Sequence, residues 1–169
     1  AIGWFTAAWV TVPEVRFLVG MIALLFVADY VRLRLRKTQP APKPHNAVKG
    51  GFWGAIAGFT SFVSHAGGPP YQVYTLPLGQ DPRLYTGTSV IFFAIINAVK
   101  LVPYFALGQF DSANLTTSLV LMPFAPFATI AGAWIVRRMD RTIFYPLMYT
   151  MVFFVGIKLV YDGLISFGS

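Results

Sequence analysis

The segment that decides the fold is residues 50–80, GGFWGAIAGFTSFVSHAGGPPYQVYTLPLGQ. It is apolar on both sides of Gly67-Gly68-Pro69-Pro70, and no ordinary helix continues through Gly-Gly-Pro-Pro. In an apolar segment this break predicts a re-entrant helical hairpin with its tip at Gly67 and Gly68. The alternative is a kink in one long, tilted span. Irregular backbone at membrane depth is tolerated only beside protein or a water-filled cavity.

The composition around this segment is that of an integral membrane protein. The chain is 56% apolar, 17% aromatic and only 11% charged, and it contains no cysteine. A typical soluble domain is about 45–50% apolar and about 25% charged. These values exclude a disordered chain and a disulfide-stapled secreted module. The net charge of +7 does not indicate nucleic-acid binding, because the charges cluster between long apolar runs.

Apolar runs of the length needed to cross a bilayer, about 20 residues, flank the hairpin. The sequence predicts an all-α membrane protein with the hairpin at 50–80 and four full spans, at 17–34, 85–107, 114–136 and 143–165. A basic, proline-rich linker occupies 36–49. Residues 1–12 are predicted to be the stub of a preceding element. Because the chain begins at Ala1 without Met or a basic leader, we expect a fragment and not a signal peptide.

The basic residues predict the topology. Of the thirteen Lys and Arg, six lie in 32–49 and three in 137–141, so both loops are predicted to be cytoplasmic. The loop at 108–113 has none and is predicted to lie outside. Two basic loops on one side require an even number of crossings between them. The spans at 85–107 and 114–136 supply two, so 50–80 must turn back, and the C-terminus ends outside.

A stripe of small and polar residues precedes the break. Gly50, Gly54, Gly58, Ser61 and His65 are spaced 4, 4, 3 and 4 residues apart, which predicts that they share one helix face. Such a stripe lets another helix approach closely, and packing is sufficient to explain the three glycines. Ser61 and His65 extend the face toward the break. We therefore treat these two as candidate substrate-binding residues.

The break itself is a candidate anion site. Proline suits the first turn of a helix, so Pro69 and Pro70 begin a second half-helix. Its N-terminus would point into the membrane interior, where the dipole and the N–H groups of Gly67 and Gly68 favour an anion. Discontinuous helices of this kind build the substrate sites of many secondary transporters.

Basic side chains inside the apolar segments are further candidates. His65, Lys100 and Lys158 are each predicted to lie roughly 22 Å from the cytoplasmic start of their segments. Polar residues at 86, 89, 97 and 100 form a stripe that predicts the lining of a polar cavity, with Ser89, Asn97 and Lys100 as substrate-binding residues. Lys158 fits snorkelling equally well. Because no carboxylate lies deep in a span, the pattern favours an anionic substrate.

Enzyme chemistry finds little support. The chain has two histidines, no cysteine and no Ser-His-acid set that could converge in the membrane. We expect no catalytic residue, no metal and no cofactor.

Residues 54–70, GAIAGFTSFVSHAGGPP, resemble the glycine-rich motif of the sulfite exporter TauE/SafE family of membrane permeases. Residues 92–104, FFAIINAVKLVPY, resemble the helix that follows in that family, as do the basic turn at 137–141 and the apolar last helix. The resemblance covers roughly residues 14–166. It extends to Gly67, Gly68 and Pro69, whereas relatives have other small or polar residues at the position of His65.

The resemblance implies two homologous halves, each opening with a glycine-rich hairpin. Residues 1–35 would end the first half and 50–169 would form the second, so the N-terminal repeat would be a partner missing from this sequence. The implied substrates are small oxidised-sulfur anions, and the implied location is the lipid bilayer of the bacterial inner membrane. A homo-oligomer, the direction of transport and the coupling ion stay open.

Two functional hypotheses follow. The first is a secondary transporter that works by alternating access around the hairpin tip. The second is a non-transporting membrane subunit or scaffold, in which the broken helix serves packing alone.

Overall fold

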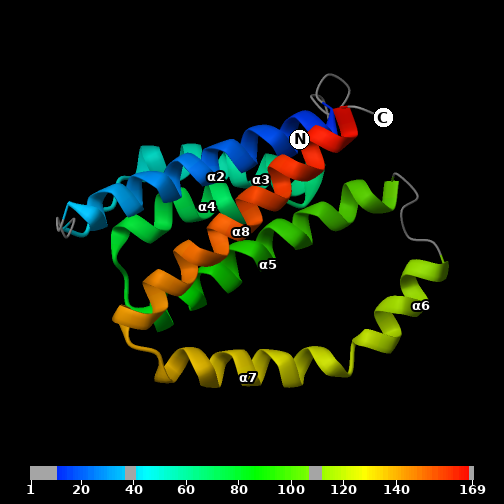
Figure 1. Ribbon diagram of the computed structural model, residues 1–169. Coiled ribbons are helices and arrows are strands. Elements are labelled where there is room, and N and C mark those ends of the chain that lie inside the picture. Colours follow the sequence, from blue (N-terminus) through cyan, green and yellow to red (C-terminus); the bar gives the residue numbers. More distant parts are fainter. Residues whose placement is uncertain (1–10, 37–40, 107–111, 168–169) are drawn as a thin grey trace. The chain divides into compact units, whose positions relative to one another are not determined.

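The computed structural model describes residues 11–36, 41–106 and 112–167, and this part of the chain is helical without β-strands (Figure 1). It forms two compact units. The first contains α2 (Val12–Leu35), α3 (Ala47–Ser64), α4 (Gly68–Thr75), the 3₁₀ helix η1 (Leu76–Leu78) and α8 (Arg141–Phe167) from Tyr145 onward. The second contains α5 (Pro82–Ala106), α6 (Ser112–Leu121), α7 (Phe124–Arg138) and the first residues of α8. The predicted stub at 1–12 and the loop at 108–113 lie largely outside the described residues.

In the first unit, α2 and α8 run antiparallel and touch through glycines. A Cβ atom added to Gly20 would lie 2.8 Å from Val160 Cγ2 and 2.9 Å from the carbonyl oxygen of Gly156. A Cβ atom on Gly163 would lie 2.9 Å from Phe17 Cβ. Glycine is therefore needed for the two backbones to approach this closely, as in many helix pairs within membranes.

The helix break is buried in the core of the first unit. Ala66, at the break, packs with Val15 and Val19 of α2, and Phe59, Val63 and Leu159 surround this cluster. Both α3 and α4 contact α2 (Figure 1). The irregular backbone between the two half-helices is thus enclosed by protein, which is the setting that such backbone requires at membrane depth.

In the second unit, α5 and α7 are in contact. An Nη2 group of Arg83 donates a hydrogen bond of 2.9 Å to the carbonyl oxygen of Arg137, near the C-terminal end of α7. The ring of Tyr85 meets that of Phe144 edge to face at 5.4 Å. Large apolar side chains of these helices are exposed, including those of Phe124, Phe127, Ile130 and Trp134. Exposed apolar surface of this extent is expected where lipid or another protein covers it.

Among the residues that the structure describes, two helices are long and apolar enough to cross a membrane, Pro82–Phe105 and Arg141–Ser166. They correspond to the predicted spans at 85–107 and 143–165. The predicted span at 17–34 corresponds to α2, which is a continuous helix of 24 residues. The all-helical class is therefore confirmed and a membrane protein fits these two helices, whereas the number of spans, the re-entrant hairpin and the division into repeats stay predictions.

The predicted span at 114–136 is not one continuous helix. It is divided into α6 and α7, which are separated by a turn at Met122 and Pro123. Pro123 has no N–H to continue the α6 ladder, and its ring clashes with the carbonyl group four residues earlier. The structure therefore replaces one long helix by helices of 10 and 15 residues.

Candidate functional site

The first half of the broken helix ends at a left-handed residue. His65 has φ 56° and follows the last residue of α3. Its N–H and that of Ala66 both donate to the carbonyl oxygen of Thr60, which satisfies a terminal carbonyl group of the helix. His65 is exposed and has left the helix. The expectation that His65 shares a helix face with Gly50, Gly54, Gly58 and Ser61 is therefore wrong, because the helix ends one residue earlier.

The second half of the broken helix runs back along the first. The hydroxyl of Tyr74, near the end of α4, donates to the carbonyl oxygen of Asn46 at 2.9 Å and accepts from its N–H at 3.1 Å. Asn46 also caps the start of α3 by accepting from the N–H of Lys49 at 3.0 Å. A Cβ atom on Gly50 would lie 3.1 Å from the Tyr74 ring. The segment is therefore a helical hairpin whose two ends meet.

Gly67, the residue before α4, lies directly against α3. A Cβ atom there would stand 2.6 Å from the carbonyl oxygen of Ala57 and 2.6 Å from Ser61 Cβ. No side chain fits without moving backbone. At Gly68, by contrast, nothing lies within 4 Å of an added Cβ atom. The two glycines, which are equivalent in the sequence pattern, have different surroundings.

The start of α4 presents few backbone donors. The N–H of Tyr71 is already bonded to the carbonyl oxygen of Gly67 at 3.3 Å. Pro69 and Pro70, both buried, have no N–H to offer. Within the first turn of α4 the N–H of Gly68 is thus the donor that a ligand could reach. Any anion held here would depend on this group, on the helix dipole and on side chains.

The remaining predicted residues lie on α5, in the second unit. Lys100 is buried, with 6% of its surface exposed. Ser89 is half-buried, and its hydroxyl donates to the carbonyl oxygen of Tyr85 at 2.7 Å. Asn97 is exposed. The other predicted residues, Ser61, His65, Gly67, Gly68 and Pro69, belong to the first unit.

Comparison with protein-family models gives a match to the sulfite exporter TauE/SafE family over residues 1–159. The chain belongs to the TauE/SafE family. Membership indicates a membrane transporter of sulfur anions, in keeping with the apolar helices α5 and α8. Searches of curated proteins and of solved structures give no significant match.

Further buried hydroxyl groups in the hairpin of this TauE/SafE chain were not predicted. Thr60 and Ser64 of α3 and Thr75, the last residue of α4, are buried, as is Ser61. The Thr60 hydroxyl donates to Ile56 at 2.9 Å, that of Ser64 to Thr60 at 3.1 Å, and that of Thr75 to Tyr71 at 2.8 Å, in each case to the carbonyl oxygen. A hydroxyl four residues after a helical carbonyl group in an apolar segment is the signal that could have identified them.

Lys158 of α8 has a partner on its own helix. Its Nζ lies 2.6 Å from a carboxylate oxygen of Asp162, and its side chain is 73% exposed. A pair at i and i+4 joins two neighbours on one helix face. The structure thus gives Lys158 a local ion pair. Across residues 11–36, 41–106 and 112–167, no cluster of three His, Asp or Glu could hold a metal ion.

Proposed function

We propose that this TauE/SafE chain carries a small oxidised-sulfur anion, sulfite or an organosulfonate, across the membrane by alternating access around the α3–α4 hairpin. The observation that supports this most is a broken helix whose break is enclosed by α2 and by Leu159 of α8. Transporter folds place substrate sites at such discontinuous helices. The chain acts as a permease and not as an enzyme.

The hairpin is proposed to be re-entrant, entering the membrane and leaving it on the same side. The contact between Tyr74 and Asn46 supports this, because it brings the two ends of the hairpin within hydrogen-bond distance. A kinked single span would carry its two ends to opposite faces of the bilayer. Residues 32–49 and 137–141 are then cytoplasmic and the C-terminus lies outside. Arg138, stacked 3.9 Å over the Trp134 ring at the end of α7, suits the membrane interface.

The anion is proposed to bind at the start of α4, and polar residues of α5 are proposed as further contacts. The N–H of Gly68 and the hydroxyl of Ser61 would donate from the hairpin, where Pro69 pre-sets the first turn. His65 stands beside this turn. Ser89, Asn97 and Lys100 would contribute from α5, and the ammonium group of Lys100 supplies a positive charge. Gly50, Gly54 and Gly58 serve packing of the hairpin.

The distribution of carboxylates favours an anion over a cation. Residues 47–78, the hairpin with η1, contain no Asp or Glu, and neither do residues 82–106 of α5. Cation pathways within membranes depend on carboxylate side chains or rings of carbonyl groups. A pathway lined by hydroxyls, an amide and an ammonium group suits an oxyanion.

To test the proposal, we would measure the flux of isotope-labelled sulfite into proteoliposomes that contain the full-length protein. We expect saturable flux that taurine-type sulfonates or sulfate inhibit, which also ranks the substrates. Absence of flux above empty liposomes, with folded protein confirmed by its circular dichroism, would contradict the proposal.

The alternative function, a non-transporting subunit or scaffold, draws on one observation. The contact of Gly67 with Ala57 and Ser61 is what a packing device needs. The two functions differ in their response to polar substitution. In a scaffold, Gly54→Asn and Gly58→Asn would disrupt assembly while Lys100→Met would have no effect. In a transporter, Lys100→Met abolishes flux in a protein that still assembles.

A further inference from the structure

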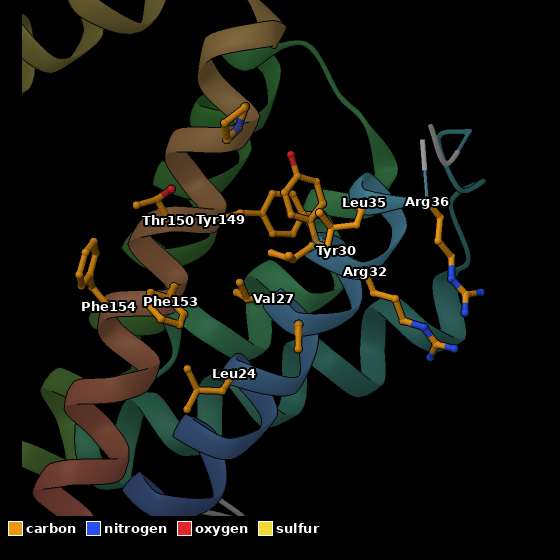
Figure 2. Close-up of a pocket in the computed structure, with 13 residues that line it drawn as sticks. Leu24, Val27, Tyr30, Arg32, Leu35, Arg36, Tyr149, Thr150, Phe153 and Phe154 are labelled. Atoms are coloured by element: carbon orange, nitrogen blue, oxygen red, sulfur yellow. The ribbon is translucent and has the colours of Figure 1, made fainter. Parts of the chain in front are cut away.

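A groove lies between α2 and α8, within the first unit. Its volume is about 1080 Å³. Figure 2 shows Leu24 and Val27 on α2 and Phe153 and Phe154 on α8, with the rings of Tyr30 and Tyr149 between the two helices. This groove is separate from the break between α3 and α4, and none of the residues proposed to bind the substrate line it.

The groove exists because the two helices meet differently along their length. Toward the N-terminal end of α2, Gly20 and Gly156 let the backbones touch. Toward its C-terminal end, the rings of Tyr30 and Tyr149 stack with centroids 3.6 Å apart and hold the helices apart. Phe26 supports this stack, with its ring centroid 5.3 Å from that of Tyr149. Small residues at one end and aromatic residues at the other leave an open wedge.

The lining of the groove has an apolar part and a basic part. Most of it is aliphatic or aromatic, and the apolar members include Leu24, Val31, Leu35 and Pro146. At the C-terminal end of α2 the lining includes Arg32 and Arg36, both exposed. Figure 2 shows their guanidinium groups extending beyond the apolar lining. No carboxylate side chain is among the residues that line the groove in the described part of the chain, and Asp29 is not one of them.

We propose that this groove binds an anionic phospholipid, with an acyl chain against the apolar lining and the phosphate against Arg32 and Arg36. The basic residues at one end of the apolar lining favour this ligand. Guanidinium groups pair with phosphate oxygens in a forked geometry, and basic residues beside an apolar surface attract anionic lipids. An apolar helix from another chain would fill the lining but would bring no charge complementary to Arg32 and Arg36. The inference requires that the protein lies in a membrane and is independent of the transported substrate.

Native mass spectrometry of the purified protein, with added phosphatidylglycerol or phosphatidylcholine, tests the proposal. We expect wild-type protein to retain phosphatidylglycerol in preference to phosphatidylcholine. The double variant Arg32→Gln, Arg36→Gln should lose this preference, because its affinity for phosphatidylglycerol should fall about fivefold for each arginine removed. The matched control is Lys43→Gln, Lys49→Gln, which removes two exposed charges from the same basic region outside the groove and should keep the preference.

A second variant fills the groove without altering its charge. Ala28→Phe, at an exposed lining position, should reduce retention of both lipids while helix content stays unchanged. Equal retention of the two lipids by wild-type protein would overturn the proposal, as would an equal loss in the arginine and lysine pairs. A lipid-free dimer that Ala28→Phe separates would also overturn it, because the groove would then be an interface between copies.

Discussion

Gly67 lies against Ser61 so closely that a Cβ atom on the glycine would stand 2.6 Å from the Cβ of the serine. This contact joins the start of α4 to the last turns of α3. It makes Gly67 a determinant of the hairpin itself, whatever anion binds nearby. Residues that build the hairpin are therefore distinguished from residues proposed to contact the substrate.

Gly67→Ala should destabilise the hairpin, whereas Gly68→Ala should not. The new methyl group at 67 meets backbone at 2.6 Å, and overpacking of this kind costs typically about 1–3 kcal/mol. At 68 the methyl group enters open space. The melting temperature of each purified variant measures the difference. Equal melting temperatures would show that the contact of Gly67 with α3 does not contribute to stability.

His65→Gly should leave the protein as stable as the wild type or stabilise it by up to about 1 kcal/mol, because φ 56° is strained for a side chain and not for glycine. His65→Val should destabilise it, since a β-branched residue tolerates this backbone least. His65→Asn is the conservative control, because asparagine accepts the left-handed conformation. Sulfite flux lost in both the Gly and the Asn variant, at unchanged stability, would assign the imidazole to the substrate.

Lys100→Met should abolish or strongly reduce sulfite flux, because it removes the buried positive charge while keeping a side chain of similar length. A hydrogen bond to a charged group contributes about 1.5–3 kcal/mol, so apparent affinity should fall between about tenfold and about 100-fold. Lys100→Arg keeps the charge and should retain part of the flux. Asn97→Ala should also lower flux, with expression intact. Normal flux in both Lys100→Met and Asn97→Ala would remove these residues from the site.

Tyr74→Phe should open the hairpin at its base. The change deletes the hydroxyl that bonds both backbone groups of Asn46 and keeps the ring beside Gly50. Two hydrogen bonds at about 0.5–1.5 kcal/mol each predict a loss of about 1–3 kcal/mol. Faster hydrogen exchange at the amides of residues 46–50 would locate the effect. Tyr30→Phe, a tyrosine outside the hairpin, serves as the control and should leave that exchange unchanged.

The sequence predicts features that depend on local backbone chemistry. Gly-Gly-Pro-Pro cannot continue a helix, so a break at residues 66–70 was predicted, and the structure has it at residues 65–67. The long apolar helices α5 and α8 were predicted from the length and composition of their segments, which are sufficient to identify them. Pro123, inside the predicted span at 114–136, is also a local signal for a helix end. One continuous span was predicted there, because a membrane helix can also tolerate a proline as a kink.

Features that depend on contacts between distant segments were not predicted. Gly20, Gly156 and Gly163 bring α2 and α8 together, yet a glycine alone in an apolar run does not reveal its partner helix. The different surroundings of Gly67 and Gly68 are likewise a property of how α4 lies on α3. For the candidate site, the sequence therefore predicts that Gly67 and Gly68 lie at the break. It does not predict that Gly67 packs against α3 or that Thr60 and Ser64 are buried there.

The two hydrogen bonds between Tyr74 and Asn46 join residues that are 28 positions apart. Together with the Gly67 contact at the tip, they hold α3 and α4 to each other at both ends of the hairpin. We therefore expect α3 and α4 to move as one rigid body, with any bending in the chain segments that flank the hairpin. One such segment includes Gly79, where a φ of 60° is a conformation that glycine adopts at little cost.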